Sequence, residues 1–424
     1  MNMSNMKQDN VYAKLPAFRS PEQWAKALSH DPWQDLDFAK LSDQNKAWYI
    51  DQLRWLYVPN ETSVEIAVRL QTLIFSALEA DEANRSAIGS AGVRQAGSPK
   101  RKLFARGMLI SGPTHVGKSV TVKRMLADFP PVIDGVAEVH GSAPLKQIVH
   151  LTIPMPADRS KKGFLSAAFL EIDRLLGYNY HGKFFGARQS VESLLVSLIN
   201  VLNAHRCALL VIEELQPTNL GRQDMLCTYF SQIFLRILNE GIPMVVIGNT
   251  AGANLLRSHT QSYTRLTESG HFEIDPYLNL PLPDGVDEEF APTYSRSRDW
   301  KRLVDRLWGK TIFSEPDEAI PAHYDWLWEK TGGMPYFLCK LRARTLEIAM
   351  EDEAATRVEK SHVEQALDAH GFVEGRDLIS AFTSRDVTKL IPFTDVDRHR
   401  YGQIWSNAFA SAKSKSAANS RGQA

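Results

Sequence analysis

The sequence predicts an α/β fold in which helices flank a parallel sheet, followed by a small helical domain. Between residues 105 and 250, short apolar runs alternate with segments of helical periodicity, a pattern that favours parallel strands joined by helices. Two of the runs, Cys207–Ile212 and Pro243–Gly248, are continuously apolar, as expected for strands buried on both faces. After an acidic loop that begins at Pro281, the segments up to residue 370 have helical periodicity, which predicts the helical domain, and residues 371–403 are mixed.

Periodicity and turn residues place the elements in order. Further strands are expected at Gly107–Ser111 and Ile148–Ile153, and an early helix at Glu61–Leu78, before a flexible loop at 86–102. The other predicted helices are Ser119–Phe129, Phe164–Leu176, Val191–Ala204, Met225–Asn239, Trp300–Trp308, Tyr324–Lys330, Pro335–Met350 and Ser361–His370. We expect four parts: a helical N-terminal segment (1–85), the α/β core (86–280), a helical lid (281–370), and a C-terminal extension with a flexible basic tail (371–424).

Composition excludes several classes of protein. Lys plus Arg and Asp plus Glu number 49 each, so any binding of a polyanion depends on local basic patches. The three cysteines have no metal-ligand or disulfide spacing. The N-terminus lacks the apolar stretch of a secretory signal, and no apolar run reaches the ~18 residues of a membrane span. A cytoplasmic protein is expected, with the early residues Trp24, Trp33, Trp48 and Trp55 in its core.

The most specific motif follows the strand Gly107–Ser111. Gly112-Pro-Thr-His-Val-Gly-Lys-Ser matches the P-loop pattern, with a helix after it, so its backbone N–H groups are expected to cradle the phosphates of ATP. Lys118 would reach the β- and γ-phosphates and Ser119 would ligate Mg²⁺. An apolar slot for adenine is expected at Tyr57-Val-Pro. The predicted nucleotide contacts are Gly112, Pro113, Thr114, His115, Val116, Gly117, Lys118, Ser119, Val120 and Tyr57.

A second motif ends the run Ala208–Ile212 in two carboxylates, the Walker B pattern with Glu in place of the usual Asp. Glu213 is expected to hold Mg²⁺ and Glu214 to polarise the attacking water. We expect this strand to lie beside the P-loop strand. The longer side chain of Glu213 is expected to loosen the Mg²⁺ geometry, which predicts slow ATP hydrolysis.

Polar residues further along complete the predicted catalytic set. Asn249 ends the next buried strand and is expected to position the water near the γ-phosphate, with Thr250 as the alternative. A neighbouring subunit often supplies an arginine that stabilises transition-state charge. Arg257 and Arg265 are the candidates, and Arg265 is preferred because it directly precedes the predicted return to the sheet at His271.

Two basic segments lie between the Walker motifs, where ring ATPases place loops that face the pore. Their residues are the candidates for contacts to a DNA backbone: Arg159, Lys161, Lys162, Lys183 and Arg188.

The order of these motifs resembles that of the TnsC/TniB family of AAA+ transposition regulators. The likeness covers about residues 45–370 and is most specific where Leu-Asn-Glu-Gly-Ile-Pro leads to Val-Ile-Gly-Asn-Thr. It implies an AAA+ P-loop ATPase that uses ATP and Mg²⁺ to assemble as a ring or helical filament, hexameric or heptameric, on double-stranded DNA. The implied partners are a transposase and a TniQ-type target-selection adaptor, and the basic tail resembles a segment that contacts the transposase.

Three other functions remain open from the residues alone. The first is another DNA-associated AAA+ ATPase, such as a helicase loader or replication initiator, although residues 371–403 look too short for the usual extra DNA-binding domain. The second is a nucleotide-gated scaffold with no DNA role, which the balanced charge permits. The third is a small-molecule kinase, which the paired glutamates and the helical lid disfavour.

Overall fold

The computed structural model describes residues 14–91, 105–136, 145–156, 160–185, 189–215, 223–278, 298–319, 323–369, 372 and 375–407. They form two compact units. Unit 1 comprises the described parts of Met1–Trp24, Glu65–Gly112 and Lys118–Glu273, and unit 2 those of Ala25–Val64, Pro113–Gly117 and Ile274–Ala424. Each unit has its own hydrophobic core.

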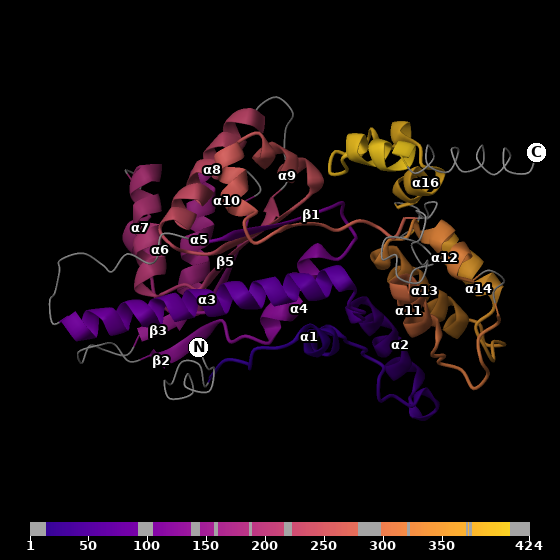
Figure 1. Ribbon diagram of the computed structural model, residues 1–424. Helices are drawn as coiled ribbons and strands as arrows, with labels where there is room; N and C mark the ends of the chain where they lie inside the picture. The colour runs from indigo at the N-terminus through magenta and orange to yellow at the C-terminus, as the bar shows by residue number, and fades with distance from the viewer. Residues whose placement is uncertain are drawn as a thin grey trace, which may run out of the picture. The chain divides into compact units, whose positions relative to one another are not determined.

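Unit 1 is built on a five-stranded parallel sheet with the order β4-β5-β6-β1-β7 (Figure 1). Strands β1, β5 and β6 are buried almost throughout, which explains their continuous apolar sequences. The strands span Gly107–Ser111 (β1), His150–Pro154 (β4), Leu209–Leu215 (β5), Met244–Gly248 (β6) and His271–Glu273 (β7).

Helices cover both faces of this sheet. In Figure 1, α5, α7 and α8 lie on one side and α3 and α4 on the other. The apolar side chains of α5, α7 and α8 form one core with Leu109, Leu210 and Val246 of the sheet. The helices of unit 1 are α3 (Glu61–Ala91, which begins in unit 2), α4 (Lys118–Ala127), α5 (Lys161–Leu176), α6 (Tyr180–Phe184), α7 (Val191–Ala204), α8 (Gln223–Asn239), α9 (Thr250–Arg257) and α10 (Thr260–Leu266).

The predicted position of the Walker B strand is wrong by one strand. We expected it beside the P-loop strand, but β6 lies between β5 and β1. Strand β6, which directly precedes Asn249, therefore separates the strands of the two Walker motifs. An apolar run indicates a buried strand but carries no information about which neighbour it pairs with, so the sequence pattern could not fix this order.

Several other features differ from the sequence prediction. An antiparallel hairpin, β2 (Val132–Val136) with β3 (Leu145–Ile148), was not predicted, nor were α9 and α10. Residues 86–91, predicted as loop, continue helix α3. Trp24 and Trp33 are buried as expected, but Trp48 and Trp55 are 58% and 51% exposed.

Unit 2 is helical, as predicted for the region after residue 280. Its core joins residues near the N-terminus, such as Trp33 and Ile50, to the C-terminal helices. The side chain of Asp31 is only 6% exposed and forms ion pairs with Lys310 at 3.1 Å and Arg306 at 3.3 Å. The elements are η3 (Phe38–Lys40), α2 (Asp43–Asp51), η4 (Gln52–Trp55), α11 (Arg298–Trp308), α12 (His323–Thr331), α13 (Pro335–Glu351), α14 (Lys360–Asp368), α16 (Arg376–Ser384) and η6 (Val387–Leu390).

Helix α1 (Pro21–Leu28) begins in unit 1 and ends in unit 2. Among the described residues, no helix is long and apolar enough to cross a membrane. The basic tail from residue 408 onward lies outside the described residues.

Candidate nucleotide-binding site

The P-loop joins the buried end of β1 directly to the first turn of α4. Gly112 and Gly117 have φ values of 147° and 95°, and His115 between them has a φ of 72°. Positive φ is accessible to glycine without steric cost, which explains glycine at both ends of the turn. Lys118 and Ser119 begin α4, where the free N–H groups and the helix dipole favour an anion. These φ values and the position at a helix N-terminus are compatible with a phosphate-binding loop.

The tip of the loop, Pro113–Gly117, is grouped with unit 2 and makes contacts there. The backbone N–H of Thr114 donates to Asp395 Oδ2 at 3.2 Å, and the hydroxyl of Thr114 also contacts that oxygen. The ring of His115 stacks on Tyr336 with a centroid separation of 4.4 Å. No sequence motif indicates the contact of Asp395 with this loop, because the two segments are 281 residues apart.

The carboxylate of Glu213 has the properties expected of a cation ligand. Glu213 is 9% exposed, and its Oε1 atom is buried without a hydrogen-bond partner among the described residues. Its Oε2 atom pairs with Lys123 Nζ at 3.1 Å, one helical turn beyond Ser119. A buried carboxylate oxygen without a donor is costly unless a cation or water satisfies it. The residues present thus fit Mg²⁺, a hard cation that prefers oxygen ligands.

Glu214 adopts a strained conformation at the end of β5. Its φ is 63°, which is unusual for a residue with a side chain, and the ladder to β6 changes register between Ile212 and Leu215. Strain of this kind is often found at functional sites. At this backbone irregularity Glu213 is buried and Glu214 is exposed, so the two neighbouring carboxylates have different surroundings.

Asn249 lies next to this strand end. Leu215 pairs with Gly248, and the N–H of Asn249 donates to Leu215 O at 3.2 Å. The Oδ1 atom of Asn249 caps α9 by accepting the N–H of Gly252 at 2.7 Å. A Cβ atom on Gly252 would lie 2.4 Å from Leu215 O, so only glycine permits this close approach. The cap occupies Oδ1 and leaves the amide nitrogen of Asn249 as the group suited to orient a water.

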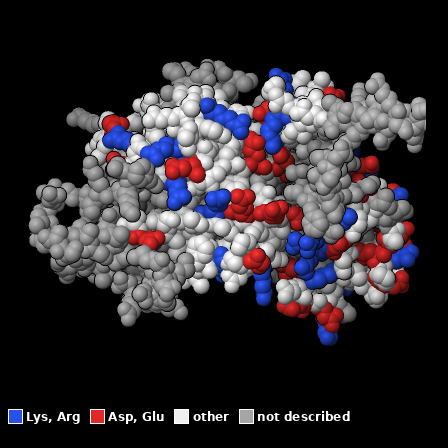
Figure 2. Space-filling model, viewed as in Figure 1, with Lys and Arg blue, Asp and Glu red and all other residues white. Residues whose placement is uncertain are grey.

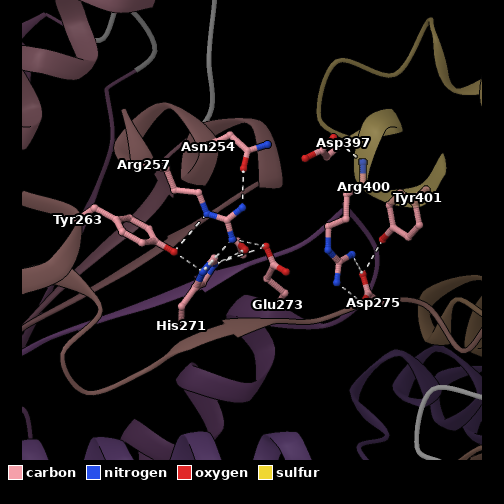
Figure 3. A network of polar contacts seen from close by, with 10 residues as sticks. Asn254, Arg257, Tyr263, His271, Glu273, Asp275, Asp397, Arg400 and Tyr401 are labelled. Atoms are coloured by element: carbon pink, nitrogen blue, oxygen red, sulfur yellow. Dashed lines mark hydrogen bonds and ion pairs between the residues drawn. The ribbon is translucent and has the colours of Figure 1, made fainter. Parts of the chain in front are cut away.

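The two candidate arginines have different surroundings. Arg265 on α10 pairs only loosely with Glu268, at 3.6 Å, among the described contacts. Arg257 on α9 is held by several groups: it pairs with Glu273 at 3.0 Å and donates to Tyr263 Oη at 3.2 Å and Asn254 Oδ1 at 3.2 Å (Figure 3). The weaker attachment of Arg265 is compatible with a side chain that acts on a neighbouring molecule.

Three of the five basic candidates are described. Lys161 and Lys162 form the first turn of α5, where Ser160 caps the helix, and Lys161 contacts the ring of Tyr229. Lys183 is exposed on α6. Arg159 and Arg188 lie outside the described residues. On the face shown in Figure 2, Lys and Arg are interspersed with Asp and Glu, with no broad basic area.

Two further residues are placed in unit 2. Tyr57 is half-buried and exchanges backbone hydrogen bonds with His30 at 2.8 and 2.9 Å. Its predicted contact with adenine stays a prediction. Arg342 on α13 is fully buried and pairs with Asp317 at 2.7 Å, so it helps to hold the helical unit together.

Comparison with known protein families identifies the fold of the α/β part of the chain. Residues 104–256 match a protein-family model described as an AAA domain. The fold of these residues is an AAA fold. The match covers less than half of the chain and includes the P-loop, Glu213, Glu214 and Asn249, but neither candidate arginine. No curated protein sequence matches the chain.

Solved structures with a similar arrangement include Cdc6p of Pyrobaculum aerophilum, with 14% identity, a TM-score of 0.41, and coverage of 75% of this chain and 70% of that one. The Orc1 protein of Aeropyrum pernix in complex with DNA has 16% identity, a TM-score of 0.39, and coverage of 80% and 83%. The Drosophila ORC bound to DNA has 15% identity, a TM-score of 0.36, and coverage of 79% and 77%. Because these TM-scores are below 0.5, we draw no functional conclusion from them.

Proposed function

We propose that this chain is an ATP-hydrolysing AAA+ protein that assembles on double-stranded DNA and links target-selection factors to a transposase. The observation that carries the ATPase part is the Glu213 carboxylate, buried with one oxygen unsatisfied among the described residues, on the same sheet edge as the P-loop. The DNA and transposition parts rest on the basic residues and on the resemblance to TnsC/TniB proteins.

The proposed chemistry follows from the residues at this edge. When bound, Mg²⁺ neutralises charge on the β- and γ-phosphates. Ser119 and Glu213 would hold it, and Lys118 would bind the same phosphates. Glu214 would accept a proton from the attacking water, and the Asn249 amide nitrogen would orient that water. Arg265 from a neighbouring subunit would stabilise the negative charge of the transition state.

Support for DNA contact comes from helix α5. Lysines in a first turn are disfavoured by the helix dipole, so Lys161 and Lys162 are placed where an anion would relieve unfavourable electrostatics. The phosphate backbone is such an anion, and contact with it gives binding without base recognition. Three of the candidate basic residues, Lys161, Lys162 and Lys183, lie among the described residues, and assembly of many subunits on one duplex would strengthen their combined binding.

DNA binding can be tested by the salt dependence of duplex-DNA affinity in the presence of a slowly hydrolysed ATP analogue. Lys162→Ala should reduce the slope of log K against log salt by about 1 for each subunit contact. Lys360→Ala is a matched control, because Lys360 begins helix α14 and is not among the DNA candidates. Equal slopes for wild type and Lys162→Ala would refute the assignment of this surface.

The link to transposition needs its own test. Purified protein assembled on DNA should retain a transposase and a TniQ-type adaptor in pull-downs only when ATP or its analogue is present. Retention of a replicative helicase instead would favour the loader alternative. A chain that binds ATP but ignores DNA would favour the scaffold.

A further inference from the structure

A continuous chain of hydrogen bonds links the strand that enters the P-loop to helix α10, which carries Arg265. Ser111 is the last residue of β1, and its Oγ lies 2.8 Å from His271 Nε2. The other ring nitrogen, His271 Nδ1, lies 2.9 Å from Tyr263 Oη on α10. Figure 3 shows His271, Tyr263 and Arg257 converging at one point, with Glu273 beside them. All of these residues belong to unit 1.

The hydrogen bonds in this series can all be donated in the same direction, from Arg257 toward Ser111. Arg257 can only donate, so its Nε donates to Tyr263 Oη at 3.2 Å and its Nη2 faces His271 Nδ1 at 3.4 Å. With a neutral imidazole protonated on Nε2, His271 Nδ1 would accept from the hydroxyl of Tyr263 and Nε2 would donate to Ser111 Oγ. Each partner satisfies the next, which holds Tyr263 in one orientation.

A second contact fixes α10 to the same strand at its other end. A Cβ atom on Gly107, the first residue of β1, would lie 2.5 Å from Leu266 Cα and 2.9 Å from Arg265 O. Glycine thus lets the backbone that bears Arg265 rest directly against β1. In addition, Ser269 N donates to Gly107 O at 2.9 Å. Helix α10 is attached to both ends of the P-loop strand, by backbone contact at Gly107 and by the imidazole at Ser111.

We propose that His271 is a positioning residue that holds Arg265 in a fixed relation to the P-loop of its own subunit, so that nucleotide at one site governs the arginine offered to the next. This inference rests on the proposed function, because it assumes that Arg265 acts on a neighbouring subunit. His271 itself is not proposed to touch the nucleotide. Its effect is transmitted through Tyr263, two residues before Arg265 on α10.

The test uses mixed assemblies in which two defects lie on different subunits. Arg265→Ala subunits retain a complete P-loop but offer no arginine. Glu214→Gln subunits bind ATP without hydrolysing it and still offer Arg265. Mixing the two should restore ATPase activity, because an Arg265→Ala site then receives the arginine of a Glu214→Gln neighbour. His271→Ala is then added either to the Glu214→Gln subunits or to the Arg265→Ala subunits, and the two mixtures are compared.

On the Glu214→Gln side, His271→Ala should lower the restored kcat by about tenfold with little change in KM for ATP, since misplacement of a transition-state group costs rate. On the Arg265→Ala side it should have little effect. Tyr263→Phe, which removes only the hydroxyl, should reproduce the asymmetry. Tyr180→Phe is the matched control, because it removes another tyrosine–histidine hydrogen bond of unit 1, to His205 at 2.7 Å.

Equal losses from both sides would overturn the inference, since they would indicate a general structural role for His271. An unchanged rate from both sides would also overturn it. If the wild type is active but the mixture of Arg265→Ala and Glu214→Gln subunits is not, Arg265 does not act on a neighbouring subunit. That result would also overturn this inference. An inactive wild type would instead contradict the proposed function itself.

Discussion

Lys123 Nζ lies 3.1 Å from Glu213 Oε2, while Oε1 of the same carboxylate is buried and accepts no hydrogen bond from the described residues. The lysine partly neutralises the carboxylate at the position proposed for Mg²⁺. A cation at Glu213 would therefore compete with the charge of Lys123. The sequence motifs did not single out Lys123, although its place one turn after Ser119 is visible in the sequence.

Replacing Lys123 by Met should strengthen Mg²⁺ binding in the presence of ATP. The lysine side chain is 64% exposed, so solvent screens much of its charge, and we expect the apparent Kd for Mg²⁺ to fall by about two- to fivefold. A titration of ATPase activity with Mg²⁺ measures this value. Glu213→Gln should have the opposite effect. Unchanged Mg²⁺ dependence in both variants would remove Glu213 from the cation site.

Glu214→Gln should stop turnover while it preserves nucleotide binding. The substitution keeps the size of the side chain but removes the proton acceptor, and loss of a general base typically costs about 10²–10⁴ in rate. Fluorescent ATP should remain bound, and its release should become slow. Glu240→Gln, an exposed glutamate after α8, provides the control. Loss of ATP binding in Glu214→Gln would show that the residue shapes the pocket instead.

Two substitutions of Asn249 distinguish its role as the N-cap of α9 from its proposed role in positioning the attacking water. Asn249→Ala removes the acceptor of the Gly252 N–H and should lower the free energy of unfolding by about 0.5–2 kcal/mol. Asn249→Asp keeps an acceptor for the cap but has no amide nitrogen. It should unfold like the wild type in urea yet hydrolyse ATP more slowly. An Asn249→Asp variant with full activity would reduce the role of this residue to helix capping.

Stability should decline as the pH falls below about 6.5, the ordinary pKa of histidine. Burial lowers the pKa of His150, His205 and His323, because desolvation penalises the charged ring. Below the unfolded-state pKa the unfolded chain binds protons that the folded chain refuses, so the free energy of unfolding decreases with acidity. Above a pH of about 6.5 the full free energy of unfolding is retained. Urea melts at pH 7.5 and 5.5 measure the difference, and His205→Gln should reduce it.

The sequence predicted the elements of the core well because each has a local cause. The strand Gly107–Ser111 and the helix Val191–Ala204 have the bounds that apolar runs and periodicity indicated. The P-loop and paired-glutamate motifs can be recognised in a sequence because their proposed chemistry requires fixed residue types at short spacing, and their roles stay predictions. The AAA fold of residues 104–256 follows from the same features.

What the sequence could not supply depends on contacts between distant residues. The insertion of β6 between β5 and β1 depends on strand pairing, which periodicity does not encode. The contact between Ser111 and His271 joins residues 160 positions apart, and neither belongs to a recognisable motif. The strained backbone of Glu214 and the exposure of Trp48 and Trp55 likewise depend on tertiary packing.

ATP binding at the P-loop is proposed to drive assembly on duplex DNA. Electron microscopy of the purified protein with double-stranded DNA, with and without a slowly hydrolysed ATP analogue, tests it most directly. We predict rings or filaments on DNA that require the nucleotide and that are absent for Lys118→Ala. Protein that binds the nucleotide but stays monomeric and does not bind DNA would rule out ATP-driven assembly on DNA.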